Sequence, residues 1–159
     1  MTLGFIGFCL CRDRFGDAHR SKPSRKEYMP NLQEVLVVSS DDEVRRNLAG
    51  IVVLWGLEPV LCVTVAASRA ALSRYPICLV VCEDRLADGS YHDLIEAVER
   101  ASSDAPVIVA SRLADWNEYM NAVHAGAFDY VTLPPRRAEI ERAIKNALNE
   151  RASEPTQSR

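Results

Sequence analysis

Short runs of hydrophobic residues alternate with longer segments whose hydrophobic residues recur at helical spacing, from residue 34 to residue 150. Five of the short runs have the length of strands: residues 34–38, 59–65, 77–82, 106–110 and 128–131. These runs are apolar at successive positions, so both faces of each strand are expected to be buried. Strands of this kind are typical of a parallel sheet that is covered by helices on each side.

A helical segment follows each of these runs. The last one is the clearest, because its hydrophobic residues fit the i, i+3, i+4, i+7, i+8 template; they are Ile140, Ala143, Ile144, Ala147 and Leu148. The first has capping-box spacing, with Ser40 as the N-cap and Glu43 three residues later, and Gly56 ends it. Trp55 and Trp116 fall at helix positions where we expect them to pack.

Five strand–helix units with right-handed crossovers leave few possible arrangements. For a chain of 159 residues we expect an α/β fold, the flavodoxin-like (βα)5 three-layer sandwich, with a parallel five-stranded sheet of order 2-1-3-4-5. In this order the switch point lies between the first and third strands. The residues that follow those strands, Ser39, Ser40 and Glu83, are therefore expected in one crevice.

Residues 1–31 differ in composition from the rest of the chain. They carry six of the nineteen Lys and Arg residues but only three of the twenty-two acids, and they are predicted to form a flexible basic N-terminal extension. Residues 32–151 are predicted to form the domain, and residues 152–159 a polar C-terminal tail. Acids outnumber bases in the domain, so its surface does not attract phosphate backbones, and we expect no nucleic-acid binding by it.

The cysteines and the apolar start of the chain bear on its location. Five cysteines without framework spacing suit a reducing cytoplasm, and Cys62, Cys78 and Cys82 are expected to be buried hydrophobic residues. Residues 1–10 lack the basic region and cleavage site of a signal peptide and are too short to span a bilayer. We therefore expect a cytoplasmic chain with no membrane contact.

The most informative segment is residues 79–89, a buried strand that runs into an acidic turn. Glu83 stands at the carboxyl end of that strand, which is the edge of a parallel sheet where ligands bind. Asp84 follows it directly. The chemistry of the site depends on which carboxylate lies in the crevice.

Three segments together resemble the receiver domain of bacterial response regulators, the CheY-like superfamily. They are residues 37–46, residues 84–90, and residues 125–130 followed by Pro134. The resemblance covers residues 34–150. It implies a stand-alone signalling module of the two-component phosphorelay type rather than an enzyme, with partners such as a sensor kinase or an output protein.

The residues that carry the chemistry of that family are largely replaced here. In the family, two acids hold Mg²⁺, an Asp accepts a phosphoryl group, a Thr or Ser binds a phosphoryl oxygen, and a Lys completes the charge clamp. The matching positions in this chain are Ser39 and Ser40, Glu83, Ser111 and Leu133 respectively. Mg²⁺ prefers carboxylates, and phosphoryl transfer depends on neutralising charge. The resemblance therefore predicts a degenerate pseudo-receiver that needs neither phosphorylation nor a cofactor.

Alternatives stay open. A shift of the first strand by two residues would make Asp41 and Asp42 the acid pair, and a scaffold or ligand-binding flavodoxin-like domain is a further possibility. If the third strand is shifted by one residue, Asp84 becomes the phosphoacceptor position, and Asp41 with Asp84 gives a weak Mg²⁺ site; the chain is then a conventional phosphoaccepting regulator that uses Asp84 or Glu83. Within the pseudo-receiver reading, Glu83 is either a phosphomimetic carboxylate that hydrogen-bonds Ser111, or a solvated carboxylate on a domain that does not switch.

The resemblance also predicts a surface for partners. Tyr130 occupies the family's aromatic switch position, and Leu133-Pro134 resembles its cis Lys-Pro junction. The face formed by the fourth helix, the fifth strand and the fifth helix is expected to bind a partner or to form a homodimer.

Overall fold

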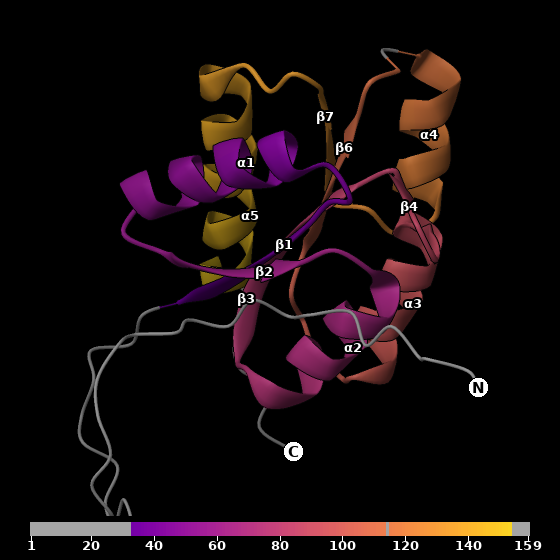
Figure 1. The fold of residues 1–159 in the computed structure, drawn as a ribbon. Coiled ribbons are helices and arrows are strands. Elements are labelled where there is room, and N and C mark those ends of the chain that lie inside the picture. Colours follow the sequence, from indigo (N-terminus) through magenta and orange to yellow (C-terminus); the bar gives the residue numbers. More distant parts are fainter. Residues whose placement is uncertain (1–32, 114, 154–159) are drawn as a thin grey trace, which may run out of the picture.

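The computed structural model describes residues 33–113 and 115–153. Its five-stranded parallel sheet has the order β2-β1-β3-β6-β7 (Figure 1). The strands are β1 (Glu34–Val38), β2 (Glu58–Cys62), β3 (Ile77–Glu83), β6 (Val107–Ser111) and β7 (Asp129–Thr132). Two short strands, β4 (Arg85–Leu86) and β5 (Gly89–Ser90), pair with each other in the loop after β3. Counted over the parallel strands alone, the order is 2-1-3-4-5, and the predicted flavodoxin-like fold is confirmed.

Helices cover both faces of this sheet (Figure 1). They are α1 (Asp42–Leu54), α2 (Val65–Arg74), α3 (Tyr91–Arg100), α4 (Trp116–His124) and α5 (Arg137–Ser153). Alternate strand residues enter two separate cores, because successive side chains of a strand point to opposite faces. In β1, Val35 and Val37 pack in the core with α1 and α5. Leu36 and Val38 pack in the other core, with α2, α3 and α4.

The first helix begins one residue later than its capping-box spacing indicated. Asp41 rather than Ser40 is the N-cap, and its carboxylate accepts hydrogen bonds from the amides of Glu43 and Val44. The Ser40 hydroxyl instead accepts from the amide of Ala87 at 3.2 Å. Asp41 prevails because one carboxylate oxygen reaches two amides that the helix leaves without partners.

The domain boundaries differ slightly from the predicted ones, and the predicted buried cysteines are found in the core. Helix α5 continues through Ser153, two residues past the boundary expected at residue 151. The expected N-terminal extension, residues 1–31, lies outside the described residues, as do residues 154–159. Cys62, Cys78 and Cys82 are buried, as predicted. Within the described part of the chain, no helix has the length and apolar character needed to cross a membrane.

The two tryptophans are more exposed than their positions predicted. Trp116 is 71% exposed and Trp55 is 37% exposed. Trp116 is the first residue of α4, a helix in which only Ala122 is buried. Trp55 is the C-cap residue of α1. Both rings lie at helix ends, beyond the contact between the helix and the sheet, and this is why packing does not cover them.

The contact between α1 and the sheet gives a stability prediction. Leu48 is 1% exposed and lies in the α1/α5 core, so Leu48→Ala is expected to lower the free energy of unfolding by about 2–5 kcal/mol. The neighbouring Asn47 is exposed, and Asn47→Ala is expected to change the free energy of unfolding by less than about 0.5 kcal/mol. Urea unfolding of both variants measures the difference. Equal effects would contradict the described packing of α1.

Candidate functional site

The carboxyl ends of β1 and β3 bring Ser39 and Glu83 together. The two strands are neighbours, and Val38 lies opposite Cys82, so the residues that follow are level with each other. The Ser39 hydroxyl donates a hydrogen bond of 2.7 Å to Oε2 of Glu83. Both residues are buried, with exposures of 0% and 8%. These two side chains therefore share the predicted crevice, and the hydrogen bond reduces the cost of burying the carboxylate.

Arg45 fixes the turn that carries Ser39. Its Nη1 donates to the Ser39 carbonyl at 2.7 Å, and its Nη2 forms an ion pair with Asp42. Arg45 is itself buried. The Ser39 hydroxyl also accepts from the amide of Asp41 at 3.0 Å. Ser39 is thus held at its hydroxyl and at its carbonyl.

Arg112, the first residue after β6, links two carboxylates at this edge. Its Nη2 lies 2.7 Å from Oδ2 of Asp41 and 3.7 Å from Oε1 of Glu83. The pKa of Asp41 is lowered, first because the Val44 amide donates to its carboxylate, with smaller contributions from the Glu43 amide and from Arg112. Arg112 is more than half exposed, so solvent weakens these ion pairs. The arrangement still puts one positive charge between the two acids.

Ser111 engages Asp84 rather than Glu83. Its hydroxyl is fully buried, donates to Oδ2 of Asp84 at 2.9 Å, and accepts from the Leu113 amide at 3.0 Å. The phosphomimetic alternative predicted a bond between Glu83 and Ser111, and Asp84 makes that bond instead. The reason is that successive side chains of a strand point to opposite faces of the sheet. The side chains of Asp84 and Ser111 point to the α3/α4 side, whereas that of Glu83 points to the α1/α5 side. The other alternative, a solvated Glu83, does not hold either, because Glu83 is buried and accepts from Ser39.

Tyr130, in β7, lies on the same side of the sheet as Ser111. Its hydroxyl donates to the Leu113 carbonyl at 2.7 Å. Burial is the main cause that raises the pKa of Tyr130, and the nearby Asp84 carboxylate also raises it. Its ring lies edge-on to Tyr119, which stacks on Trp116. A continuous set of contacts thus joins the Asp84–Ser111 pair to the exposed aromatic surface of α4.

Leu133 occupies the position where the family has a Lys. It is 8% exposed and belongs to the α1/α5 core. Its amide donates to the Ser111 carbonyl at 2.7 Å, and the Leu133-Pro134 bond is cis, as the resemblance implied. The backbone of the junction is therefore retained, while its side chain contributes no charge to the crevice.

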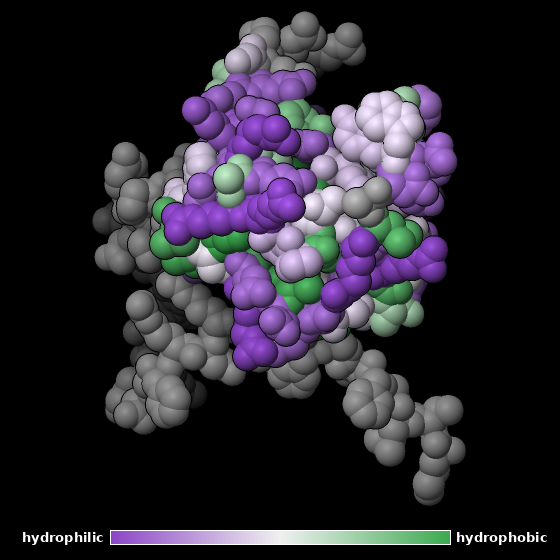
Figure 2. Space-filling view, turned by 90° about the horizontal axis from the view of Figure 1, so that it is seen from above, coloured by the Kyte–Doolittle hydropathy of each residue, from purple (hydrophilic) through white to green (hydrophobic). Residues whose placement is uncertain are grey.

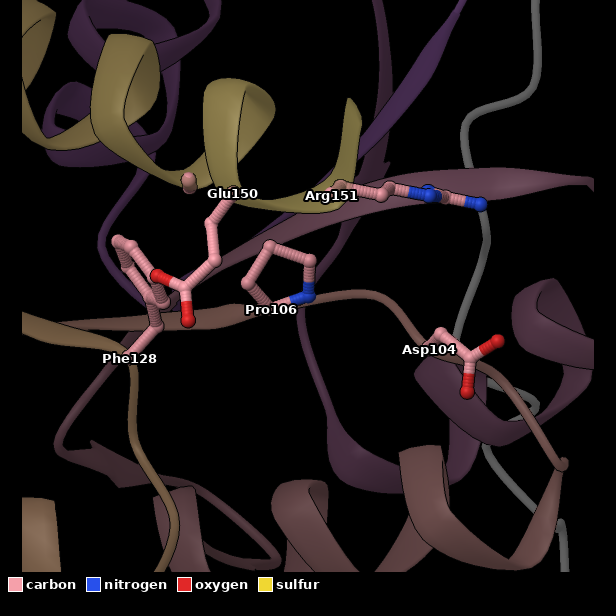
Figure 3. A pocket seen from close by; sticks show the side chains of 6 residues that line it. Asp104, Pro106, Phe128, Glu150 and Arg151 are labelled. Atoms are coloured by element: carbon pink, nitrogen blue, oxygen red, sulfur yellow. The ribbon is translucent and has the colours of Figure 1, made fainter. Parts of the chain in front are cut away.

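The surface outside this crevice is also hollowed in places. An open groove of about 610 Å³ lies between α3 and α4, and Asp84, Tyr91 and Glu118 help to line it. A hollow of about 120 Å³ lies at the amino end of β6 beside the end of α5, where Glu150 reaches toward Phe128 (Figure 3). Sites for small molecules usually measure about 300–1,000 Å³. The hollow beside Phe128 is therefore too small for such a ligand.

The surface seen from above the orientation of Figure 1 is mostly hydrophilic (Figure 2). Hydrophobic residues appear there as separate small areas among charged and polar ones. This view shows no wide apolar cleft, so recognition over this face depends on polar side chains and on small apolar contacts.

The donor set does not fit the Mg²⁺ site of the family. Ser39 and Ser40 are neutral, and Ser40 faces the loops at Val63 and Ala87. Asp41 and Asp84, the ligands of the alternative Mg²⁺ site, have different partners. Asp41 pairs with Arg112, and Asp84 accepts a hydrogen bond from Ser111. In the described residues, no three His, Cys, Asp or Glu side chains form a group that could hold a metal ion.

Arg112 was not among the site residues predicted from the sequence. It directly follows Ser111, at the carboxyl end of a strand beside the crevice. The replacement of the family's Lys by Leu133 was the available signal, because the acids left at this edge need another cation. A search of the neighbouring strand ends for an Arg or Lys finds Arg112.

The chain is similar in sequence to known regulators. Over 110 residues it is 30% identical to the photosynthetic apparatus regulatory protein RegA of Rhodovulum sulfidophilum, covering 69% of this chain and 60% of RegA. Over 122 residues it is 27% identical to the response regulator protein PilR of Pseudomonas aeruginosa, covering 77% of this chain and 27% of PilR. The chain therefore spans less than two thirds of the length of these relatives.

Solved structures have the same fold. A CheY-like response regulator receiver domain from Methanospirillum hungatei superposes with a TM-score of 0.70 at 21% identity, covering 78% of this chain and 99% of that one. The beryllofluoride-activated NtrC4 receiver domain dimer gives 0.68 at 22% identity, covering 74% and 97%. No family model matches the chain. The sequence relatives are regulatory proteins that include a response regulator, and the structural neighbours are CheY-like receiver domains, which supports the resemblance seen in the sequence.

Proposed function

We propose that this receiver domain is a pseudo-receiver, which acts in the cytoplasm by protein–protein interaction and without phosphoryl transfer, Mg²⁺ or another cofactor. The observation that carries the proposal is the guanidinium of Arg112 between the carboxylates of Asp41 and Glu83. A positive charge that belongs to the chain thus lies among the acids where the family uses a metal ion.

Charge and coordination both support this proposal. A divalent cation needs several hard oxygen ligands, and at this edge Ser39 and Ser40 offer only neutral hydroxyls. Arg112 would repel a second cation that approached Asp41 or Glu83. Glu83 is buried and accepts from Ser39. Because a displacement of about 1 Å can cost about a hundredfold in rate, this longer carboxylate is a poor phosphoacceptor.

The alternative, a conventional phosphoaccepting regulator, has less support. With Asp84 as the acceptor, a metal ion would have to sit near Asp84, but this carboxylate accepts from Ser111 on the α3/α4 side. The only described Lys is Lys145 on α5, and Leu133 is in the core. The charge clamp that phosphoryl transfer requires therefore has no Lys.

The contacts of Asp84 favour one fixed state of the domain. In the family, the hydroxyl residue moves toward the phosphoryl group and the aromatic residue follows it. Here the Asp84 carboxylate holds the Ser111 hydroxyl, and the Tyr130 hydroxyl is bonded to the Leu113 carbonyl. We infer that Asp84, rather than Glu83, has the role expected of a permanent substitute for the phosphoryl group.

The surface offered to partners is the face of α4, β7 and α5. Trp116 and Leu113 are 71% and 52% exposed there, and Trp116 stacks on Tyr119. Exposed aromatic residues are enriched in protein interfaces. We propose that this face binds a sensor kinase, an output protein or a second copy of the chain; the solved NtrC4 receiver is itself a dimer.

Phosphorylation gives the most direct test of the pseudo-receiver. Incubation with radiolabelled acetyl phosphate and Mg²⁺ is expected to leave the chain unlabelled, since the metal ligands and the clamp are replaced. The matched positive control restores the family's residues with Ser39→Asp, Ser40→Asp, Glu83→Asp and Leu133→Lys. We expect labelling of this variant after the same incubation. Stoichiometric labelling of Glu83 or Asp84 in the unmodified chain would overturn the proposal.

The bridge by Arg112 gives a prediction for the pKa of Asp41. Arg112→Ala is expected to raise this lowered pKa only in part, because the Val44 amide still donates to the carboxylate. The contribution of Asp41 to stability is present above its unfolded pKa and is lost as the pH falls through its folded pKa. Carboxyl ¹³C NMR titration measures the change. Arg137→Ala is the matched control, and the same pKa in both variants would contradict the bridge.

The partner face gives a third prediction. Trp116→Glu is expected to change the free energy of unfolding by less than about 0.5 kcal/mol, because the ring is exposed, and to weaken association through this face. Sedimentation velocity over a series of concentrations measures self-association. Wild-type chain that remains monomeric throughout would exclude the homodimer, and a dimer that Trp116→Glu leaves intact would place its interface elsewhere.

A further inference from the structure

The end of α1 carries a compact apolar patch on the opposite side of the sheet from α4. It consists of Val53, Leu54 and Trp55, which are 56%, 64% and 37% exposed; we call it the α1-end patch. The other large hydrophobic residues exposed in the described chain are Leu113, Trp116 and Val123, around α4. The α1-end patch is thus separate from the proposed partner face.

The chain enters the domain beside this patch. The amide of Glu58 donates to the carbonyl of Gln33 at 3.1 Å, and Trp55 precedes Glu58 by three residues. At 3.8 Å between successive Cα atoms, Trp55 lies within about 11 Å of Glu58 along the backbone. In Figure 1, α1 ends and β1 begins on the same side of the molecule. Whatever precedes Gln33 therefore joins the domain next to Trp55.

The segment that precedes Gln33 begins with a stretch that has no charged residue before Arg12. Its hydrophobic side chains include Leu3, Phe5, Ile6, Phe8 and Leu10. An uncharged stretch of this composition gains free energy by covering apolar surface. Residues 11–32 separate it from β1, and fully extended they span on the order of 70 Å. The stretch can therefore reach the α1-end patch with length to spare.

We propose that residues 1–10 of this chain bind the α1-end patch, with Phe5 and Phe8 packed against Leu54 and Trp55. Attachment to the same chain favours this occupant, because binding within one molecule acts at an effective concentration of up to the millimolar range. A second copy of the domain is a weaker candidate. Three partly exposed side chains supply on the order of a few hundred Å², whereas a stable interface between proteins buries above about 1,000 Å².

The test uses Trp55 as a probe in the full chain. The chain has two tryptophans, so Trp116→Phe makes Trp55 the only one. In that background, Phe5→Asp with Phe8→Asp is expected to increase acrylamide quenching of Trp55 roughly twofold and to shift its emission to longer wavelength, because the tethered apolar cover is lost. Phe15→Asp, the same change outside residues 1–10, is the matched control and is expected to have no effect.

Two further measurements separate the possible outcomes. Leu54→Asp, which changes the patch and keeps Trp55, is expected to produce the same increase in quenching. Dilution of the Trp116→Phe chain is expected to leave quenching unchanged, because the contact is within one molecule. The proposal is overturned if Phe5→Asp with Phe8→Asp has no effect, if Phe15→Asp has the same effect, or if dilution alone exposes Trp55, which would indicate a second copy.

Discussion

The alternation of side chains along the strands determines which polar groups meet at the carboxyl edge of the sheet. Successive residues of a strand point to opposite faces, so a slip of one residue would exchange the two sets. At the carboxyl edge, Ser39, Glu83 and Arg112 fall on the side of α1 and α5, while Asp84 and Ser111 fall on the side of α3 and α4. The polar residues of one crevice are thereby divided into two hydrogen-bonded sets. The Ser111 hydroxyl therefore lies in one set with Asp84, and the Arg112 cation lies in the other set.

The cation in the first set differs in kind from a metal ion. Mg²⁺ exchanges with solvent, and its binding responds to the concentration of the ion and to a phosphoryl group. The guanidinium of Arg112 is covalently attached and always charged, so a positive charge stays near Asp41 and Glu83 without a bound ion. Under the proposed function, the charge at this site therefore does not vary with the binding of a metal ion.

The fold and half of the site could be predicted from the sequence, for a common reason. Strands buried on both faces give long apolar runs, and the switch point of the sheet then brings Ser39 and Glu83 together. The partners of Asp84 and Arg112 were missed because they depend on where a strand ends. The fourth parallel strand was predicted to end at Ala110, and it ends at Ser111. The residue at which a strand ends determines which loop side chains face each side of the sheet. The hydrophobic pattern does not indicate that residue.

The second set connects the crevice to the surface through direct contacts. Asp84 holds Ser111, whose hydroxyl also accepts from the Leu113 amide; the Leu113 carbonyl accepts from Tyr130, and the ring of Tyr130 meets Tyr119. In a switching receiver, such a path transmits a change only if one of its elements has two arrangements. Here the first position is the Asp84 carboxylate, which belongs to the chain. Under the proposed function, the same contacts hold the aromatic surface of α4 in one shape, and that shape is what a partner would recognise.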